Sequence, residues 1–539
     1  MRRLYSHRSS PIILLLIVIF CGSVYALQGS TAENGSNAKA VHDLGITGKG
    51  VKVGLMTFGN VLATHRAFLD ANGVTSVFNH NYTTDNAGFI YIYHDTPFAG
   101  IIKSRGTPSH PNDIGVAPDA NIHCGRIVDN TSGIQLSYIQ TALNDLVANL
   151  GCKVIVTGIQ FGAADVNANG QSQWTLAYDY YAQQYDVIFA NAAGNSYPNI
   201  TVFGDGYNGI TTGSLEDSAI DNYNQVGDTT INGPTVDGRK KPEVMTPSTG
   251  QVVPGYSGGD PNYWYITPGD GATSWAVPHT AGVAALLFQY ANQSTDPDDG
   301  HGEVIKAVIV NSTFPNILDK NGNYTDPANQ TWNNQRGYGR IDALRAYQTL
   351  SSAKVSKSTT ITSSVGWAYD TMSSSATHTY IIRSNKNKRL VLTVTWNRKI
   401  NFNKNNPSPY SVDLPLFNID LTVKNPEGGI IYSETDDVNN LEKVDLLLPA
   451  DGNYTVTLHN TTTKSRAYGL AFELLPPIPG DFDTNYVVDE RDLNQIAVEW
   501  LTAGPDADIV HDSNNIVNWL DFAAFADNWL KFDKRYFTP

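Results

Sequence analysis

Residues 271–288 read GATSWAVPHTAGVAALLF and are the most informative stretch of this 539-residue chain. The run starts with Gly271 and brings Ser274 to the beginning of a segment made almost entirely of small and apolar residues. A segment without a polar face predicts a buried helix. A hydroxyl in the first turn of such a helix lies beside backbone N–H groups and the positive end of the helix dipole, where an oxyanion is stabilised. Ser274 is therefore either a helix cap or a nucleophile.

The string ATSWAVPHTAGVAALL favours the nucleophile, because it resembles the serine motif of subtilisin-like peptidases (subtilases), usually written GTSMAxPHVAGxAALL. The resemblance extends along the whole predicted helix. It implies an α/β fold with a parallel sheet flanked by helices, and it makes Ser274 the nucleophile of a peptidase. Such catalysis needs no cofactor.

Two further motifs follow the order of the same family. Residues 93–102, YHDTPFAGII, resemble HGTHVAGII and place His94 on the catalytic histidine, although the second histidine is Pro97 here. Residues 187–195, VIFANAAGN, resemble VVxAAAGN and place Asn195 on the oxyanion-hole asparagine. Alone, each would be an ordinary surface or turn residue. Their order along the chain favours the catalytic assignment.

The main departure from the family is Thr57. Residues 45–59, GITGKGVKVGLMTFG, resemble GxGVxVAVIDTG and put Thr57 where the family has its catalytic aspartate. A hydroxyl can accept a hydrogen bond but carries no charge. Loss of that carboxylate lowers turnover by roughly 10⁴ in a comparable triad. Asp95 adjoins His94, but neighbouring helical side chains point in different directions, so we do not expect it to compensate.

Two functions remain open from these motifs. The first is a secreted serine endopeptidase, with Ser274 as nucleophile and His94 as base, impaired by Thr57. The second is a catalytically inactive subtilase homologue that binds peptides or extracellular partners. Both readings predict the same fold, and both take peptides or proteins as ligands.

The resemblance covers residues 45 to 350, where segments 233–247 and 337–346 also match family motifs. Beyond it, alternating segments such as 390–396 and 453–458 predict an antiparallel β-sandwich, which resembles the jelly-roll domain of some secreted subtilases. The expected organisation is a signal peptide (1–26), an N-terminal segment (27–44), a peptidase domain (45–352), a β-sandwich (353–476) and a dockerin-like module (480–532).

The C-terminal segment has the spacing of calcium-binding loops. From Asp481, oxygen-bearing side chains stand at loop positions 1, 3, 5, 9 and 12, and the carbonyl of Val487 stands at position 7. The pattern resembles a dockerin repeat, and a second copy at 510–521 lacks the first carboxylate, so its affinity is weaker or absent. The alternative is an acidic surface tail. The candidate calcium ligands are Asp481, Asp483, Asn485, Val487, Asp489, Asp492, Asp512, Asn514, Asn518 and Asp521.

The N-terminus and the charge indicate where the protein works. Basic residues, the apolar run 12–20 and the small-residue pattern at 24–26 predict an export signal cut after about Ala26, with an uncleaved anchor as the alternative. A net charge of -15 argues against nucleic-acid partners. We expect a secreted or extracytoplasmic bacterial monomer, attached to a cell surface or a cohesin-like partner through its tail.

Two cysteines, Cys124 and Cys152, remain after the predicted cleavage. Both fall at or near predicted strands of one sheet. A disulfide and two buried free thiols are equally compatible with this placement.

Overall fold

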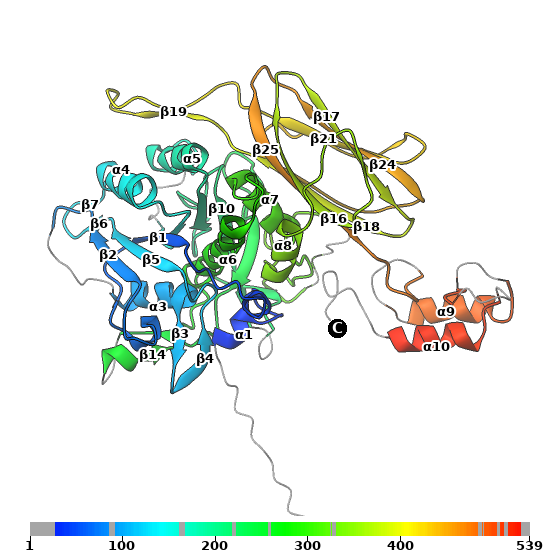
Figure 1. The fold of residues 1–539 in the computed structure, drawn as a ribbon, viewed down its shortest axis with the longest axis horizontal. Helices are drawn as coiled ribbons and strands as arrows, with labels where there is room; N and C mark the ends of the chain where they lie inside the picture. The colour runs from blue at the N-terminus through cyan, green and yellow to red at the C-terminus, as the bar shows by residue number, and fades with distance from the viewer. Residues whose placement is uncertain are drawn as a thin grey trace, which may run out of the picture.

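Eight strands form the central sheet of the N-terminal part of the chain (Figure 1). The computed structural model describes residues 27–529, except 86–91, 161–167, 218–221, 257–259, 324, 326–329, 483–487, 489, 504–506 and 511–515. The strand order is β11-β10-β9-β8-β1-β5-β2, with β12 also paired to β10, and every pairing except β10 with β11 is parallel. The parallel α/β fold is thus confirmed. The strands are β1 (Lys52–Thr57), β2 (Val77–Asn81), β5 (Asn121–Arg126), β8 (Val154–Thr157), β9 (Ile188–Ala192), β10 (Ile210–Glu216), β11 (Gln225–Val226) and β12 (Val244–Pro247).

Helices cover both faces of this sheet. Along β8, Val154 and Val156 belong to one hydrophobic core and Ile155 to another, because successive side chains of a strand point to opposite faces. Helices α3, α6 and α7 pack into the first core, and α4 and α5 into the second. The helices are α1 (Leu27–Thr31), α2 (Ala38–His42), α3 (Ile92–Lys103), α4 (Leu136–Leu143), α5 (Gln173–Tyr185), α6 (Thr273–Gln293), α7 (Gly302–Asn311) and α8 (Ala343–Leu350).

Helix α6 is the buried helix that the serine motif predicts. Its residues from Thr273 to Gln289 are all buried. Gly282 lets the chain at Val116 come close, since a Cβ at this glycine would lie 2.5 Å from the Val116 side chain. The small residues of the motif therefore serve close packing between α6 and its neighbours.

The two cysteines are free and buried. Cys124 lies on β5 in the first core, and Cys152 lies just before β8 in the second. Strand β1 runs between β5 and β8, so the thiols are about two strand spacings, roughly 9.5 Å, apart. A disulfide needs Cα atoms within about 7 Å. Of the two alternatives, the structure therefore has the free thiols.

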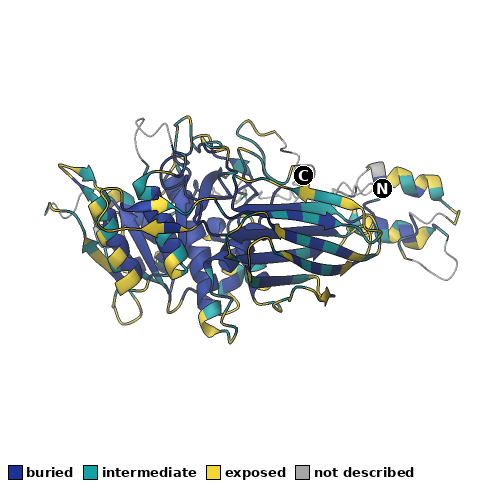
Figure 2. Ribbon diagram, turned by 90° about the horizontal axis from the view of Figure 1, so that it is seen from above, coloured by how far each residue is buried: buried dark blue, intermediate teal, exposed yellow. Residues whose placement is uncertain are grey.

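The second part of the chain is a β-sandwich (Figure 1). One sheet has the order β15-β17-β24-β21-β22 and the other β16-β25-β18-β23, and their facing side chains share one core. Figure 2 shows continuous buried regions along these sheets and along the central sheet. The strands are β15 (Thr360–Ile361), β16 (Val365–Met372), β17 (Thr377–Ser384), β18 (Arg389–Trp396), β21 (Ile419–Lys424), β22 (Ile430–Glu434), β23 (Leu441–Leu447), β24 (Gly452–Asn460) and β25 (Arg466–Leu475).

Helix α7 connects the two parts. It packs against β18 and β25 of the sandwich as well as against the central sheet. Gly469 makes this contact possible, because a Cβ there would lie 2.4 Å from the backbone of Glu303. Trp367, Leu441 and Ala471 of the sandwich belong to the same hydrophobic core as α6.

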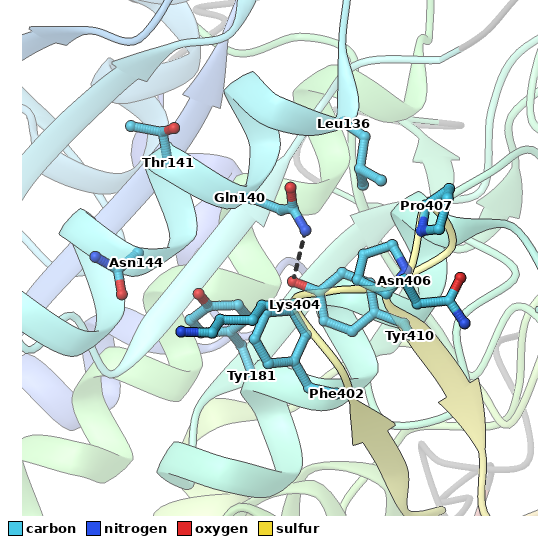
Figure 3. A pocket seen from close by; sticks show the side chains of 11 residues that line it. Leu136, Gln140, Thr141, Asn144, Tyr181, Phe402, Lys404, Asn406, Pro407 and Tyr410 are labelled. Carbon is cyan, nitrogen blue, oxygen red and sulfur yellow. Dashed lines mark hydrogen bonds between the residues drawn. The ribbon is translucent and has the colours of Figure 1, made fainter.

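A hairpin of β19 (Ile400–Phe402) and β20 (Tyr410–Val412) extends from the sandwich onto α5. The backbone of Tyr410 bonds in both directions with the Gln173 side chain, at 2.9 and 3.0 Å. Figure 3 shows that α4 and the hairpin line a common pocket, with Gln140 donating to the Tyr410 hydroxyl at 3.4 Å. The pocket has a volume of about 530 Å³.

Two helices, α9 (Glu490–Glu499) and α10 (Trp519–Asn528), lie side by side near the C-terminus (Figure 1). They enclose a small core that includes Val488, Ile496 and Phe525. Among the residues that the structure describes, none of the helices combines the length and hydrophobicity that crossing a membrane requires.

Short pairs of strands, two 3₁₀ turns and a π-helical segment (Asn144–Asn149) complete the described structure. The pairs are β3 (Arg105–Thr107) with β4 (His110–Ile114), β6 (Val128–Asp129) with β7 (Gly133–Ile134), and β13 (Val253–Pro254) with β14 (Tyr265–Ile266). The turns span Arg66–Phe68 and Pro261–Tyr263.

Candidate active site

Ser274 is the second residue of α6, so its side chain stands in the first turn, where backbone N–H groups lack helical partners. The side chain is 7% exposed. Its hydroxyl donates to the carbonyl oxygen of Gly158, just after β8, at 3.0 Å. A Cβ at Gly158 would lie 2.4 Å from the Phe98 ring, so this glycine lets α3 approach the serine.

His94 stands in the first turn of α3, the helix that packs on α6. Its ring lies 5.1 Å from the Trp275 ring, centroid to centroid, and 5.2 Å from the Phe58 ring, which it meets edge-on. Trp275 directly follows Ser274. The structure therefore brings the first turns of the two helices, and the two predicted catalytic residues, to one place.

Thr57 ends β1 and is 1% exposed. Its hydroxyl donates to the carbonyl oxygen of Gly59 at 2.8 Å and lies 3.2 Å from the Cys124 sulfur. These contacts fix the hydroxyl within the loop that follows β1. Thr57 thus occupies the position expected from the motif, with its hydroxyl turned to the loop and β5.

The side chains of Asp95 and His94 are in contact, although neighbouring residues of a helix were expected to point in different directions. The Oδ1 atom of Asp95 lies 3.2 Å from Nδ1 of His94, and the aspartate side chain is 1% exposed. Its other oxygen, Oδ2, accepts from the backbone N–H of Gly59 at 2.6 Å. The loop after β1 lies over the first turn of α3, and it contacts both side chains.

Burial raises the pKa of the Asp95 carboxyl, while hydrogen bonds from His94, Gly59 and Phe58 act in the opposite direction. The same carboxyl also affects its surroundings. The pKa of the Cys124 thiol is raised to about 12, mainly by burial and further by the negative charge of Asp95. Cys124 is therefore an inert thiol, and Asp95 is close enough for its charge to reach β5.

Asn195 follows β9 and is fastened to the start of α6. Its Oδ1 atom accepts from the backbone N–H of Thr273 at 2.7 Å and from the Thr273 hydroxyl at 3.0 Å. Its backbone N–H donates to Oε1 of Gln160 at 2.6 Å. Among the described residues, no acceptor takes a hydrogen bond from the Asn195 side-chain N–H₂ group. That group can therefore donate to an oxyanion beside Ser274.

His279 lies in the same motif but is a structural residue. It is fully buried and makes ring contacts of 3.2 Å with the Ser36 hydroxyl and 3.0 Å with Oε1 of Gln251. Burial lowers its pKa to about 3, so the ring stays neutral. His94 is therefore the histidine of the site.

Sequence reasoning missed Asp95 and Gln160. The available signal for Asp95 was a pair of changes: an acid stands where the family has glycine after its histidine, and Thr57 stands where the family has an acid. For Gln160 the signal is the resemblance of residues 160–162 to the segment that walls the substrate cleft in subtilases. Its contact with Asn195 depends on two loops that meet only in the folded protein.

The described candidate calcium ligands lie at the ends of the two C-terminal loops. Asp492 accepts from the N–H of Phe482 at 2.6 Å, and Asp481 is also buried. In the second copy, Asp521 accepts from the N–H groups of Val510 and Asn518, each at 2.9 Å. The other candidates lie outside the described residues, namely Asp483, Asn485, Val487, Asp489, Asp512 and Asn514.

Elsewhere in the described part of the chain, one mixed cluster at the junction with the sandwich could hold a metal ion. Ligand atoms of Asp186, His301 and Glu303 lie within 4.8 Å of one another. His301 pairs with Asp186 at 3.2 Å, and its ring stacks on Tyr369 with centroids 3.9 Å apart. In this arrangement the histidine and the aspartate satisfy each other without an ion.

The fold and the order of these residues along the chain are those of the subtilisin-like serine peptidase family. The model of the Subtilase family matches residues 48–339, which is more than half of the chain, and the chain belongs to that family. It is 26% identical over 324 residues to the membrane-bound transcription factor site-1 protease of Rattus norvegicus, covering 59% of this chain and 27% of the relative. It is 26% identical over 251 residues to a thermostable alkaline protease of Halalkalibacterium halodurans, covering 47% and 60%.

The chain thus spans about a quarter of the length of the site-1 proteases that it matches. One solved structure with a similar fold is that of the prenylagaramide maturation protease PagA. It has 18% sequence identity and a TM-score of 0.44, and the match covers 58% of this chain and 98% of that one.

Proposed function

We propose that the chain is a serine endopeptidase that hydrolyses peptide bonds with Ser274 as nucleophile and His94 as general base. The observation that carries the proposal is the packing of α3 on α6, which brings His94, in the first turn of α3, within 5.1 Å (ring centroid to centroid) of Trp275, the residue after Ser274. The two relatives above are named as proteases, which supports the same activity.

In this proposal each residue has a defined role. His94 takes the proton of the Ser274 hydroxyl, whose oxygen attacks the scissile carbonyl carbon and forms a tetrahedral intermediate. The N–H₂ group of Asn195 and the backbone N–H of Ser274 stabilise the oxyanion. His94 then gives the proton to the leaving amine, and water releases the acyl group by the same steps.

The second candidate is an inactive homologue that binds peptides or extracellular partners. One observation favours it: the Ser274 hydroxyl donates to Gly158 in this structure instead of to His94. A fluorophosphonate probe separates the two functions, because it reacts only with an activated serine. We expect the wild-type chain to be labelled at Ser274, and both Ser274→Ala and His94→Ala to remain unlabelled. Folded wild-type protein that resists the probe supports the inactive homologue.

We also propose that the peptidase is exported. Support comes from the basic, apolar and small-residue pattern of residues 1–26, which lie outside the described residues. A secreted bacterial monomer acting on peptides or proteins fits this pattern, with the tail attaching it to a cell surface or a cohesin-like partner. The acidic net charge of -15 makes nucleic acid an unsuitable partner.

For the C-terminal module we propose a dockerin-like role with structural calcium. The helices α9 and α10 flank two segments with related spacing, and Asp492 and Asp521 hold backbone N–H groups of their own loops. Titration calorimetry of the full chain with calcium should show binding that disappears when residues 478–539 are deleted. Equal heats from both chains would contradict the proposal.

A further inference from the structure

We propose that Asp95 supplies the carboxylate that Thr57 lacks: it orients His94 and stabilises the imidazolium formed during catalysis. The inference rests on the proposed peptidase function and deepens it, because it supplies the acidic third member of a triad with Ser274 and His94. Asp95 is a positioning residue in this scheme, since it acts on His94 and not on the substrate.

The first support is the direct contact. Oδ1 of Asp95 lies 3.2 Å from Nδ1 of His94, and the aspartate is buried while the histidine remains partly accessible. A carboxylate beside Nδ1 holds the ring proton on that nitrogen and leaves the lone pair of Nε2 as the base. This is the tautomer that can take the Ser274 proton.

The second support is the place where the carboxylate is held. Oδ2 accepts from the N–H of Gly59 at 2.6 Å, and the N–H of Phe58 also contributes. These are the two residues that follow Thr57. The Asp95 carboxylate therefore lies against the loop at the end of β1, which is where an acid at position 57 would start.

The third support comes from Thr57 itself. Its hydroxyl donates a hydrogen bond to the Gly59 carbonyl and contacts the Cys124 sulfur, so these contacts direct it away from His94. The loop after β1 thus contacts the Thr57 hydroxyl and also binds the Asp95 carboxylate of α3. In this scheme the acidic group stands on α3 instead of at the end of β1.

The electrostatic setting suits this role. A buried carboxylate beside a histidine gains a strong attraction when the ring becomes positively charged, because the surrounding dielectric is low. Backbone N–H groups from the loop hold the charge in place and limit the cost of its burial. Asp95 also stands in the first turn of α3, where the helix dipole favours a negative charge.

The test compares removing the carboxylate with moving it. We expect Asp95→Asn and Asp95→Gly to lower kcat by about 10³ to 10⁴, as loss of the triad acid does elsewhere, with KM within about twofold. The acid limb of kcat/KM should move to lower pH, because the imidazolium loses its negative neighbour. Adding Thr57→Asp to Asp95→Gly should restore kcat at least about tenfold, since the acid then returns to the strand end.

Asp113 provides a matched control. It is also buried, it lies 2.9 Å from Nδ1 of His110, and it accepts a backbone N–H from Leu27 at 2.9 Å. Asp113→Asn should affect the melting temperature as Asp95→Asn does, but leave kcat and the pH profile unchanged. An equal loss of kcat in Asp95→Asn and Asp113→Asn would show that Asp95 acts only on the stability of the fold.

The outcomes distinguish this inference from the function on which it rests. Wild-type protein that reacts with the fluorophosphonate, together with unchanged kcat and pH profile in Asp95→Asn, would overturn the role of Asp95 alone. Wild-type protein that does not react would overturn both. If Asp95→Asn does not fold, Asp95→Gly is compared with the double variant Thr57→Asp/Asp95→Gly. A higher kcat in the double variant supports the role of Asp95, and an equal kcat overturns it.

Discussion

At the scale of single residues, Asn195 has two tasks on one side chain. Its oxygen holds the backbone and hydroxyl of Thr273, the residue before the nucleophile. Among the described residues, no acceptor takes a hydrogen bond from its side-chain N–H₂ group. Because one half of the amide is structural and the other half is catalytic in our proposal, replacing the whole side chain would mix two effects.

Asn195→Asp separates them. The aspartate keeps an oxygen that can accept from Thr273, but it removes the N–H₂ donor and adds a negative charge next to the oxyanion. We expect kcat to fall by at least about 10² with little change in KM, as for other losses of an oxyanion donor. Steady-state kinetics and a melting curve check this. A variant with full activity would remove Asn195 from the oxyanion site.

Motif order predicts that Ser274, His94 and Asn195 belong to one site, and the structure places Asn195 on Thr273 and His94 beside Trp275, the two neighbours of Ser274. Motif order could not predict Asp95, because helical geometry describes only the directions that side chains take from their own helix. The expected directions were wrong for this pair, because the His94 and Asp95 side chains are in contact; compensation for Thr57 by Asp95 is the proposal made above. The loop carrying Phe58 and Gly59 lies over the first turn of α3 and supplies the backbone N–H groups that hold the carboxylate.

At the scale of elements, α7 is the helix that the two parts of the chain share. Glu303, in its first turn, is buried at the junction, and its Oε1 atom accepts from Asn397 of the sandwich at 2.8 Å. Burial raises the pKa of Glu303 to about 7, and the negative charge of Asp186 contributes further. His301 beside it has its pKa raised by its hydrogen bond to Asp186.

The raised pKa of Glu303 makes stability depend on pH. Folded protein binds the Glu303 proton more tightly than unfolded protein, so the free energy of unfolding falls as pH rises from about 4.5 to about 7. His301 acts in the same direction, because its raised pKa stabilises the fold only while the ring is charged. Glu303→Gln cannot ionise, and we expect its melting temperature relative to wild type to be a few degrees higher at pH 8 than at pH 5.

Glu490→Gln is the control for this measurement, because it makes the same chemical change at an exposed position of α9, outside the junction at Glu303. A Glu303→Gln variant whose offset from wild type is the same at pH 5 and pH 8 would show that the carboxyl does not titrate between them.

Some elements could be predicted from local pattern. The helix expected in 271–288 is α6, and the strands expected at 390–396 and 453–458 are β18 and β24. The hairpin of β19 and β20 was not predicted, because its place on α5 depends on contacts between residues far apart in sequence, such as Gln173 with Tyr410. Periodicity reports which face of an element is buried, but not which partner covers it.

At the scale of the whole molecule, the peptidase part and the sandwich are less separate than their sequences indicate. A change of composition near Ser351 predicts a linker between two domains, and the chain does change architecture there. However, a hydrophobic core crosses that boundary through Trp367, Leu441 and Ala471. Composition marks where a chain changes character, whereas the extent of a core depends on packing that only the fold determines.

The approach of Gly469 to α7 therefore has a consequence for how the protein can be divided. Removing the sandwich would uncover one side of α7 and part of the core beneath α6, so the peptidase part would lose apolar packing instead of a dispensable attachment. We therefore expect that a chimera keeps a stable peptidase part only if the domain that replaces the sandwich offers a surface that fits α7.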